Sequence, residues 1–193
     1  MAKLILSSRD FRDEKTAECI RCHLSCPIEK CRMLYFPNEK ATAERIRSGE
    51  YHGRLVDFGF SRENIRVFDY FSSADFDAAP GIDAVYISGG NTFGTLKRIR
   101  ESGADRLIID LVKKGAVYIG GSAGAHIACS SVAHTAKYDN DTFGLTDHTG
   151  LGLFDGILIC HYTDERRADY AQLLEQEKCV IRLRDEDHVV IEK

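Results

Sequence analysis

The sequence lacks long hydrophobic runs, an excess of positive charge, internal repeats and low-complexity segments. It has no run of 18 apolar residues, and a helix needs about 20 to cross a bilayer, so no membrane span is expected. The formal net charge is −4, which favours neither nucleic acid nor an anionic membrane surface as a partner. The apolar part of the N-terminal segment is too short for a secretory signal, so a cytoplasmic location is the expectation.

The composition is that of an ordinary globular protein. The chain has 193 residues, of which 44% are hydrophobic and 29% are charged. This length favours one domain spanning residues 1–193 with a sizeable core. We expect a monomer or a homodimer. The seven cysteines are an odd number, which fits free thiols in a reducing compartment.

Strand-like and helix-like segments alternate along the chain. Strands alternating with helices of this length are typical of βαβ units, so an α/β fold with a mainly parallel sheet is predicted. A region rich in Asp, Asn, Thr and Gly, 135–149, is predicted to be a long exposed loop. The expected strands are 3–7, 31–36, 64–70, 82–87, 116–119, 153–160, 179–183 and 188–191. The expected helices are 10–24, 41–55, 92–102, 104–114 and 166–177.

One glycine-rich turn follows an apolar strand and precedes a helical segment. Residues 117–119 (Val-Tyr-Ile) are typical of the end of a buried strand, and residues 120–124 (Gly-Gly-Ser-Ala-Gly) fit the pattern G-x-S-x-G. A strand, a tight turn and a helix in this order form a nucleophile elbow, which lifts one hydroxyl above the carboxyl edge of a sheet. Ser122 is therefore predicted to be a catalytic nucleophile, with helix capping as its alternative role.

A second glycine turn lies one βα unit earlier. Residues 83–87 form an apolar strand, and residues 88–93 (Ser-Gly-Gly-Asn-Thr-Phe) follow it. Neighbouring parallel strands end at one edge of a sheet, so the two turns are expected side by side there. Acyl transfer needs two N–H donors for the oxyanion, one after the nucleophile and one from a neighbouring loop. The N–H groups of Ala123 and Gly90 are the candidate donors. The alternative is that the glycines of the second turn are needed only for the backbone angles of the turn.

A serine hydroxyl needs a general base, and the chain has seven histidines. His161 directly follows the apolar strand 156–160 and is expected at a sheet edge, so it is the preferred base, ahead of His126 and His148. His126 lies four residues after Ser122 on the same helix and would point away from it. Carboxylates able to orient the imidazole lie on both sides of His161, and the residue pattern does not choose between them. They are Asp139, Asp141, Asp147 and Asp155 before it, and Asp185, Glu186 and Asp187 after it.

Four cysteines lie close together near the N-terminus. Cys19, Cys22, Cys26 and Cys31 are spaced C-x₂-C-x₃-C-x₄-C, which suggests a metal or iron–sulfur site. The first three fall on a predicted helix and its end, and cysteine is a common buried residue. We therefore interpret the cluster as packed or incidental thiols and expect neither a metal nor a cofactor.

The two glycine turns, together with residues 160–162 (Cys-His-Tyr), resemble the peptidase E family. These serine peptidases include aspartyl dipeptidase and, more distantly, cyanophycinase, and the resemblance covers most of the chain. It implies a three-layer α/β sandwich of the class I glutamine amidotransferase-like (flavodoxin-like) type. It also implies Ser122 as nucleophile, His161 as base, and an acid in the turn after the apolar strand 179–183. That position matches Asp185 best, with Glu186 next to it.

The resemblance extends to the oxyanion hole and the substrate. It implies the N–H groups of Gly90 and Ala123 as oxyanion donors, and a dipeptide with N-terminal Asp as substrate. Asn91 in the second turn is an expected substrate contact. An aspartate in the loop after the nucleophile helix matches Asp139 when counted back from His161, whereas counting forward from Ser122 gives Lys137. An arginine after the histidine, linked to the substrate's acidic side chain, matches Arg166 most nearly.

Three functions are compared on this basis. The leading one is a serine exopeptidase acting on small peptides. An esterase or acyl hydrolase of the α/β-hydrolase type would also use Ser122, but its acid would precede His161 in the chain. A non-catalytic amidotransferase-like binding module is the third, because fold does not fix function. The orientation of His161 relative to Ser122 discriminates between the enzymes and the binding module.

Overall fold

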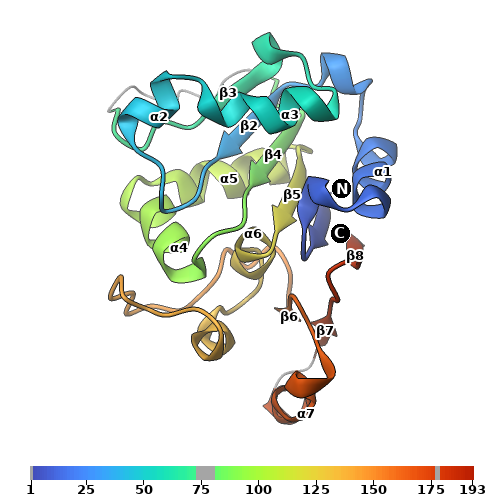
Figure 1. The fold of residues 1–193 in the computed structure, drawn as a ribbon, viewed down its shortest axis with the longest axis vertical. Helices are drawn as coiled ribbons and strands as arrows, with labels where there is room; N and C mark the ends of the chain where they lie inside the picture. Colours follow the sequence, from blue (N-terminus) through green and yellow to red (C-terminus); the bar gives the residue numbers. More distant parts are fainter. Residues whose placement is uncertain (1, 73–80, 177–178) are drawn as a thin grey trace.

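The computed structural model describes residues 2–72, 81–176 and 179–193. Its centre is a six-stranded sheet with the strand order β3-β2-β4-β5-β1-β8 (Figure 1). Neighbouring strands pair in parallel, except that β8 runs antiparallel to β1. The strands of this sheet are β1 (Lys3–Ser7), β2 (Met33–Phe36), β3 (Ile65–Val67), β4 (Ala84–Ile87), β5 (Val117–Gly121) and β8 (His188–Glu192).

Helices cover both faces of this sheet because side chains alternate between the faces along each strand. On one face, Val85 and Tyr118 belong to a core that includes buried residues of α4, α5 and α6. On the other face, Tyr86 and Ile119 pack in a second core with residues of α1 and α3. The predicted three-layer α/β sandwich with a mainly parallel sheet is therefore confirmed. The helices are α1 (Glu14–His23), α2 (Ala43–Arg47), α3 (Gly53–Phe58), α4 (Thr92–Glu101), α5 (Ala104–Lys113), α6 (Ala123–Ile127) and α7 (Arg167–Gln176).

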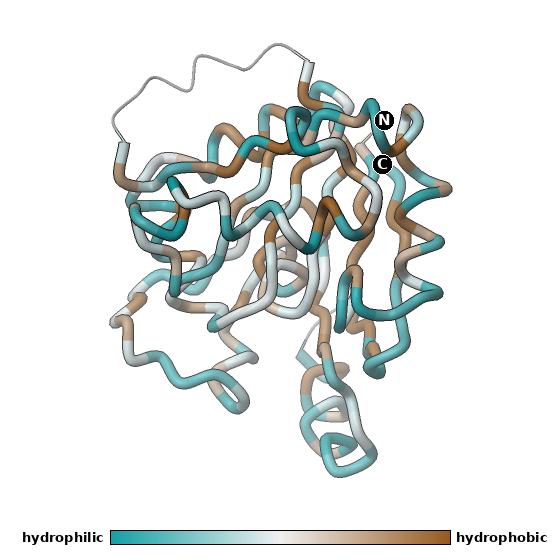
Figure 2. Tube along the Cα trace, turned by 45° about the horizontal axis from the view of Figure 1, so that its top comes forward, coloured by the Kyte–Doolittle hydropathy of each residue, from teal (hydrophilic) through white to brown (hydrophobic). Residues whose placement is uncertain are grey.

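A second, smaller sheet lies apart from the main one. Strands β6 (Ile157–Ile159) and β7 (Val180–Arg182) pair in parallel with each other. The sequence predicted both strands, but nothing in it indicated that they leave the main sheet. Helix α7 connects them and extends away from the body of the molecule (Figure 1). Hydrophobic segments lie mainly along the central strands, and hydrophilic segments dominate the outer turns (Figure 2).

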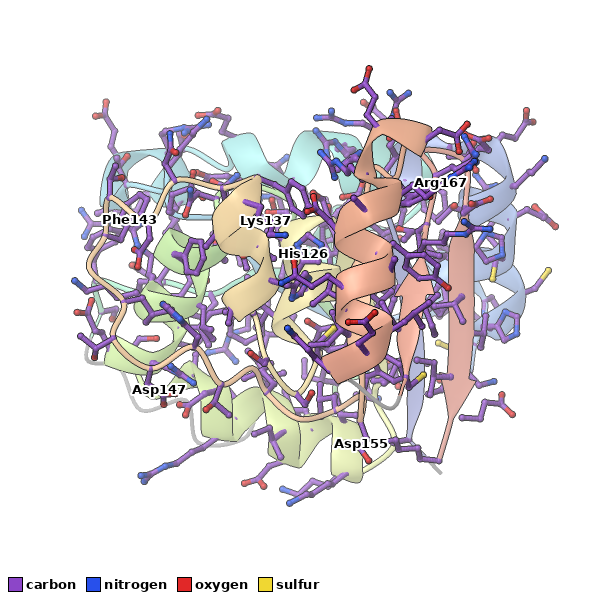
Figure 3. The ribbon with its side chains drawn as sticks, turned by 90° about the horizontal axis from the view of Figure 1, so that it is seen from below. His126, Lys137, Phe143, Asp147, Asp155 and Arg167 are labelled. Atoms are coloured by element: carbon purple, nitrogen blue, oxygen red, sulfur yellow. The ribbon has the colours of Figure 1, made fainter. Side chains whose placement is uncertain are left out.

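Two segments differ in detail from the predictions. The single helix expected over 41–55 is divided into α2 and α3, because Gly49 adopts a left-handed conformation (φ 77°) that ends α2. The loop expected over 135–149 begins as a short 3₁₀ helix and then runs along α4 (Figure 3). Lys97 donates a 2.7 Å hydrogen bond to the carbonyl of Phe143, and Arg100 donates one to the carbonyl of Asp147. The loop is thus held against the helix.

Among the described helices, none combines the length and the hydropathy needed to cross a membrane.

The start of α6 packs directly on β4, and this contact depends on Gly124. A Cβ atom at this position would overlap the carbonyl oxygen of Ile87 and lie 3.1 Å from its Cβ. A backbone oxygen cannot rotate away as a side chain can. The second glycine of the G-x-S-x-G pattern is therefore required by close packing, and it lets the nucleophile turn sit against the neighbouring strand.

Gly124→Ala should destabilise the protein by about 2–3 kcal/mol or more, because the added methyl group overpacks a rigid backbone contact. Gly53→Ala is the matched control, because a Cβ at Gly53 meets nothing within 4 Å and alanine is the better helix former. Urea unfolding of both variants checks the prediction. Equal free energies of unfolding for the two variants would contradict the packing argument.

Candidate active site

Ser122 lies in a sharp turn between β5 and α6. Its backbone has φ 50° and ψ −108°, a conformation that non-glycine residues rarely adopt. The turn is fixed by a 2.8 Å hydrogen bond from the Ser122 N–H to the carbonyl of Ser7 at the end of β1. This is the strand, strained turn and helix of a nucleophile elbow, and it exposes the hydroxyl at the carboxyl edge of the sheet.

The side chains of Ser122, His161 and Asp185 form a continuous hydrogen-bonded chain. Ser122 Oγ lies 3.0 Å from His161 Nε2, and His161 Nδ1 lies 2.6 Å from Asp185 Oδ1. A carboxylate at Nδ1 fixes the proton there, which leaves Nε2 free to accept the serine proton. The three residues therefore have the geometry of a nucleophile, a base and an orienting acid.

Asp185 is held in its charged form. The hydrogen bond to His161 is the main cause that lowers the pKa of Asp185 below its ordinary value, and the Arg9 guanidinium, which forms an ion pair with it, acts in the same direction. Glu186, the alternative acid, is exposed. The Asp187 carboxylate accepts a 2.8 Å hydrogen bond from the Arg184 N–H within its own turn.

The small sheet brings the base and the acid together. His161 follows β6 and Asp185 follows β7. Because Ile159 pairs with Arg182 in parallel, both segments leave the small sheet at the same edge. The pairing continues beyond the strands, where the Tyr162 N–H donates a 2.9 Å hydrogen bond to the carbonyl of Leu183. The base and the acid are thus positioned as one unit.

Two serines at the end of β1 connect this unit to the main sheet. Among the residues that the structure describes, three non-glycine residues have a positive φ, namely Asp10, Ser122 and His161. The backbone N–H of each donates to Ser7 or Ser8: Asp10 to Ser7 Oγ at 2.9 Å, Ser122 to the Ser7 carbonyl at 2.8 Å, and His161 to Ser8 Oγ at 3.0 Å. Strained backbone of this kind gathers at functional sites.

The two glycine turns lie side by side, as predicted. A Cβ at Gly89 would lie 3.3 Å from the Cβ of Ser122. Asn38 donates a 2.7 Å hydrogen bond to the Gly89 carbonyl, and in a planar peptide this fixes the direction of the Gly90 N–H. As the first residue of α6, Ala123 has no acceptor within the helix for its N–H. The N–H groups of Gly90 and Ala123 are therefore suitable oxyanion donors, the role that the sequence predicted for them.

A pocket of about 820 Å³ opens beside Ser122 and His161. Gly90, Tyr35 and Tyr86 line it. Its wall is rich in cationic side chains, which outnumber the two acidic ones, Asp10 and Glu50. The cationic residues are Arg9, Arg12, Lys40, Arg45 and Arg54.

Asp10 and Arg54 form an oppositely charged pair in this pocket. The Asp10 side chain is 6% exposed, and its Oδ1 lies 3.8 Å from Arg54 NH1. Its carboxylate accepts hydrogen bonds from the Tyr86 hydroxyl at 2.8 Å and from the Phe11 N–H at 2.8 Å. Burial raises the pKa of Asp10 above its ordinary value, and Tyr86 and Arg54 oppose this shift.

Three residues expected at the substrate are not brought to the pocket. Asn91 caps α4 through a 2.9 Å hydrogen bond from the Gly94 N–H, and Asp139 accepts a 2.8 Å hydrogen bond from the Thr92 N–H of the same helix end. Arg166 donates to the carbonyl of Cys160 at 2.8 Å and lies over the Tyr138 ring. Local capping and stacking therefore account for these side chains, and the expectation that they bind substrate is not supported by their positions.

The other candidate histidines do not approach the hydroxyl of Ser122. His126 is buried, and burial holds its pKa well below the usual range. The Cys160 N–H donates to its Nε2 at 3.3 Å, so Nδ1 carries the proton and faces Thr92 Oγ1 at 3.3 Å. His148 lies 3.7 Å from Asp141. His126 has a structural role as a neutral imidazole in the core.

Ser8, Asn38, Asp10 and Arg54 were not among the residues predicted from the sequence. None of the four belongs to a catalytic motif, and each reaches the site from a turn or a helix remote in sequence from Ser122. A usable signal was present for two of them, because Ser8 and Asp10 lie within three residues of the end of the first predicted strand. In a parallel sheet, that position lies at the same edge as the nucleophile.

Comparison with known proteins connects this geometry to peptidases. Peptidase E of Escherichia coli O1:K1 / APEC is 48% identical over 90 residues, which is 45% of this chain and 37% of that protein. The uncharacterized peptidase Lmo0363 of Listeria monocytogenes is 37% identical over 84 residues, 42% of this chain and 41% of that protein. These matches span less than half the length of each curated relative.

Solved structures share the fold of the whole chain. A crystal structure from Listeria monocytogenes EGD-e superposes with a TM-score of 0.72 at 19% identity, covering 100% of this chain and 99% of that one. A peptidase from an acI-B1 Actinobacterium gives a TM-score of 0.62 at 16% identity, covering 100% of this chain and 84% of that one. The model of Peptidase family S51 matches residues 4–193. The chain therefore belongs to Peptidase family S51.

Proposed function

We propose that this protein is a serine exopeptidase that hydrolyses small peptides through an acyl-enzyme on Ser122. The observation that carries the proposal is the chain of hydrogen bonds from Ser122 Oγ to His161 at 3.0 Å and from His161 to Asp185 at 2.6 Å. Membership of Peptidase family S51 supports it. The two peptidase relatives described above support the same reaction class.

In this mechanism Ser122 Oγ attacks the scissile carbonyl while His161 Nε2 takes its proton. Asp185 keeps the imidazole oriented and stabilises the imidazolium. The N–H groups of Gly90 and Ala123 stabilise the oxyanion of the tetrahedral intermediate. His161 then donates the proton to the leaving amine, which breaks the peptide bond and leaves an ester on Ser122. Water, activated by the same histidine, hydrolyses this ester.

The pocket suggests how a free acidic N-terminus is recognised. The residue whose carbonyl is attacked carries an α-ammonium group, and a buried carboxylate is a suitable partner for it. Asp10 provides that carboxylate in the pocket beside Ser122. Arg54 lies 3.8 Å from Asp10, so it suits a substrate carboxylate close to the ammonium group, as in N-terminal Asp. We propose these two residues as the recognition pair in place of Asp139 and Arg166, which the sequence placed at the substrate.

The two other functions have less support. In an α/β-hydrolase the acid precedes the histidine, whereas the carboxylate that contacts His161 here is Asp185, which follows it. A non-catalytic binding module needs no base beside the serine, yet His161 faces Ser122 at hydrogen-bond distance.

Ser122→Ala and His161→Ala should each reduce kcat for dipeptide hydrolysis by about 10⁴-fold or more, because nucleophile and base act as a unit. Asp185→Asn should cost less but still orders of magnitude, because the imidazole loses its orienting charge. Initial-rate kinetics on Asp-Leu, with circular dichroism to verify folding, checks this.

Glu186→Gln is the matched control for the acid, since Glu186 is the exposed neighbour of Asp185. It should leave kcat within about twofold, as expected for a surface substitution away from the chemistry. A severe loss in Glu186→Gln together with a mild one in Asp185→Asn would reverse the assignment of the acid.

Arg54→Ala should lower kcat/KM for Asp-Leu by about 2–3 kcal/mol of transition-state binding, because a charge-assisted contact is lost. The rate on Ala-Leu should change little. Arg166→Ala is the control, since that arginine lies over Tyr138; it should leave the ratio of the Asp-Leu and Ala-Leu rates unchanged. If Arg166→Ala rather than Arg54→Ala removes the preference for Asp-Leu, the recognition pair is misassigned.

Recognition of the α-ammonium should depend on pH through Asp10. Burial raises the pKa of Asp10 above its ordinary value of 3.8. As the pH falls towards this raised pKa, Asp10 takes up a proton and no longer attracts the ammonium group. KM for Asp-Leu should therefore rise with acidification in the wild type and be high and flat in Asp10→Asn. Asparagine tolerates the left-handed backbone at this position, so the variant is expected to fold. N-acetyl-Asp-Leu, which lacks the ammonium group, should show the same KM in both proteins.

A further inference from the structure

Two of the four N-terminal cysteines meet at the edge of the sheet opposite the candidate active site. A ligand atom from each of Cys26, Cys31 and Asp83 lies within 4.8 Å of the others. Cys31 is buried, whereas Cys26 and Asp83 are partly exposed. Cys31 and Asp83 lie just before β2 and β4, while Ser122 follows the end of β5, so the sheet separates the two places.

Local structure brings these three residues together. A 3₁₀ turn over Ile28–Lys30 separates the two cysteines, and it is closed by a 2.9 Å hydrogen bond from the Lys30 N–H to the Pro27 carbonyl. The turn reverses the chain, so the cysteines flanking it face each other. Strands β2 and β4 pair in register, with Met33 beside Ala84. That register places Asp83 opposite Arg32, which directly follows Cys31 and whose N–H donates to the Asp83 carboxylate at 3.0 Å.

The two remaining cysteines of the segment, Cys19 and Cys22, lie on α1 and contact other residues of that helix. The Cys22 thiol is exposed and lies 3.6 Å from Glu18 Oε1. Cys19 contacts His23, whose Nδ1 lies 2.8 Å from the Cys19 carbonyl oxygen. The exposed Cys22 is therefore an incidental thiol rather than a packed one, and Cys19 is partly buried. The cluster divides into two parts with different surroundings.

The chemistry of the group suits a thiophilic divalent cation. Two thiolates and one carboxylate carry three negative charges, which a divalent cation and the Arg32 guanidinium together neutralise. Arg32 donates to Asp83 from its backbone N–H at 3.0 Å, from Nε at 3.0 Å and from NH2 at 3.3 Å. A ligating carboxylate is usually held by such an outer hydrogen-bonding partner. In tetrahedral zinc sites, sulfurs bonded at about 2.3 Å lie about 3.8 Å apart, so small side-chain movements suffice for ligation.

We propose that Cys26, Cys31 and Asp83 form a binding site for one zinc ion, with water as the fourth ligand. The ion would link the segment after α1 to the starts of β2 and β4. The site is independent of the proposed peptidase activity, because it lies at the opposite edge of the sheet. This proposal replaces the expectation, drawn from the sequence, that the four cysteines are packed or incidental thiols that bind no metal.

Cobalt titration of the full-length protein, stripped by a chelator and kept reduced, tests the proposal. One equivalent of Co²⁺ should give visible d–d bands of tetrahedral intensity and a near-ultraviolet thiolate charge-transfer band, and Zn²⁺ should displace it. Cys26→Ser and Asp83→Asn should each weaken binding by about 100-fold or more, since losing a ligand costs more than losing an outer partner. Cys22→Ser is the matched control and should bind like the wild type. Thermal unfolding verifies that each variant is folded. Cys26→Ser is expected to fold because it alters a side chain that is only partly buried.

Three results would overturn the site. The first is the absence of cobalt bands in the reduced wild type, and the second is undiminished binding in Cys26→Ser. The third is equal loss in Cys22→Ser and Cys26→Ser, which would make Cys22 of α1 a ligand as well and replace the proposed ligand set. If peptide mapping finds a Cys26–Cys31 disulfide and the reduced protein takes up no metal, the pair forms a disulfide instead of a metal site.

Discussion

The candidate active site depends on the hydrogen bonds made by Ser7 and Ser8 at the end of β1. These two residues accept the backbone N–H groups of Asp10, Ser122 and His161, which are the three described non-glycine residues with positive φ. Each such conformation costs on the order of 1–3 kcal/mol and persists only where the surroundings hold it. Here the anchor is a strand paired on both sides, with β5 and with β8, so an internal strand of the sheet supports the strain.

This arrangement explains how two sheets share one site. The main sheet contributes Ser122, and the small β6–β7 sheet contributes His161 and Asp185 as a unit. Ser8 joins them, because its hydroxyl accepts from the His161 N–H at 3.0 Å and donates to the Leu183 carbonyl at 3.1 Å. Two ion pairs flank this joint: Arg9 pairs with Asp185, and Arg54 lies near Asp10. The end of β1 and the turn after it therefore hold the base and the nucleophile, and this turn also contributes Arg9 and Asp10 to the wall of the pocket.

Local patterns were enough to predict the layered α/β fold and the elbow around Ser122, because strand hydrophobicity and glycine turns act over short distances. The residue pattern alone left the acid open among seven carboxylates, and the resemblance selected Asp185, which does contact His161. The separate pairing of β6 with β7 was not predictable, since pairing partners are set by tertiary packing. Asn91, Asp139 and Arg166 were expected at the substrate because of their position in sequence, but capping of α4 and stacking on Tyr138 occupy them. Asp10 and Arg54 reach the pocket from elements with no motif, so only the three-dimensional arrangement identifies them.

The central claim is that Ser122 is a nucleophile activated by His161. Labelling with a fluorophosphonate, followed by intact-mass measurement and peptide mapping, tests it most directly because it requires no knowledge of the natural peptide. We expect one adduct per chain, located on Ser122, and labelling at least about 100-fold slower in a folded His161→Ala variant, in keeping with the loss of a general base. An adduct on another residue, or equal labelling rates in the two proteins, would contradict it.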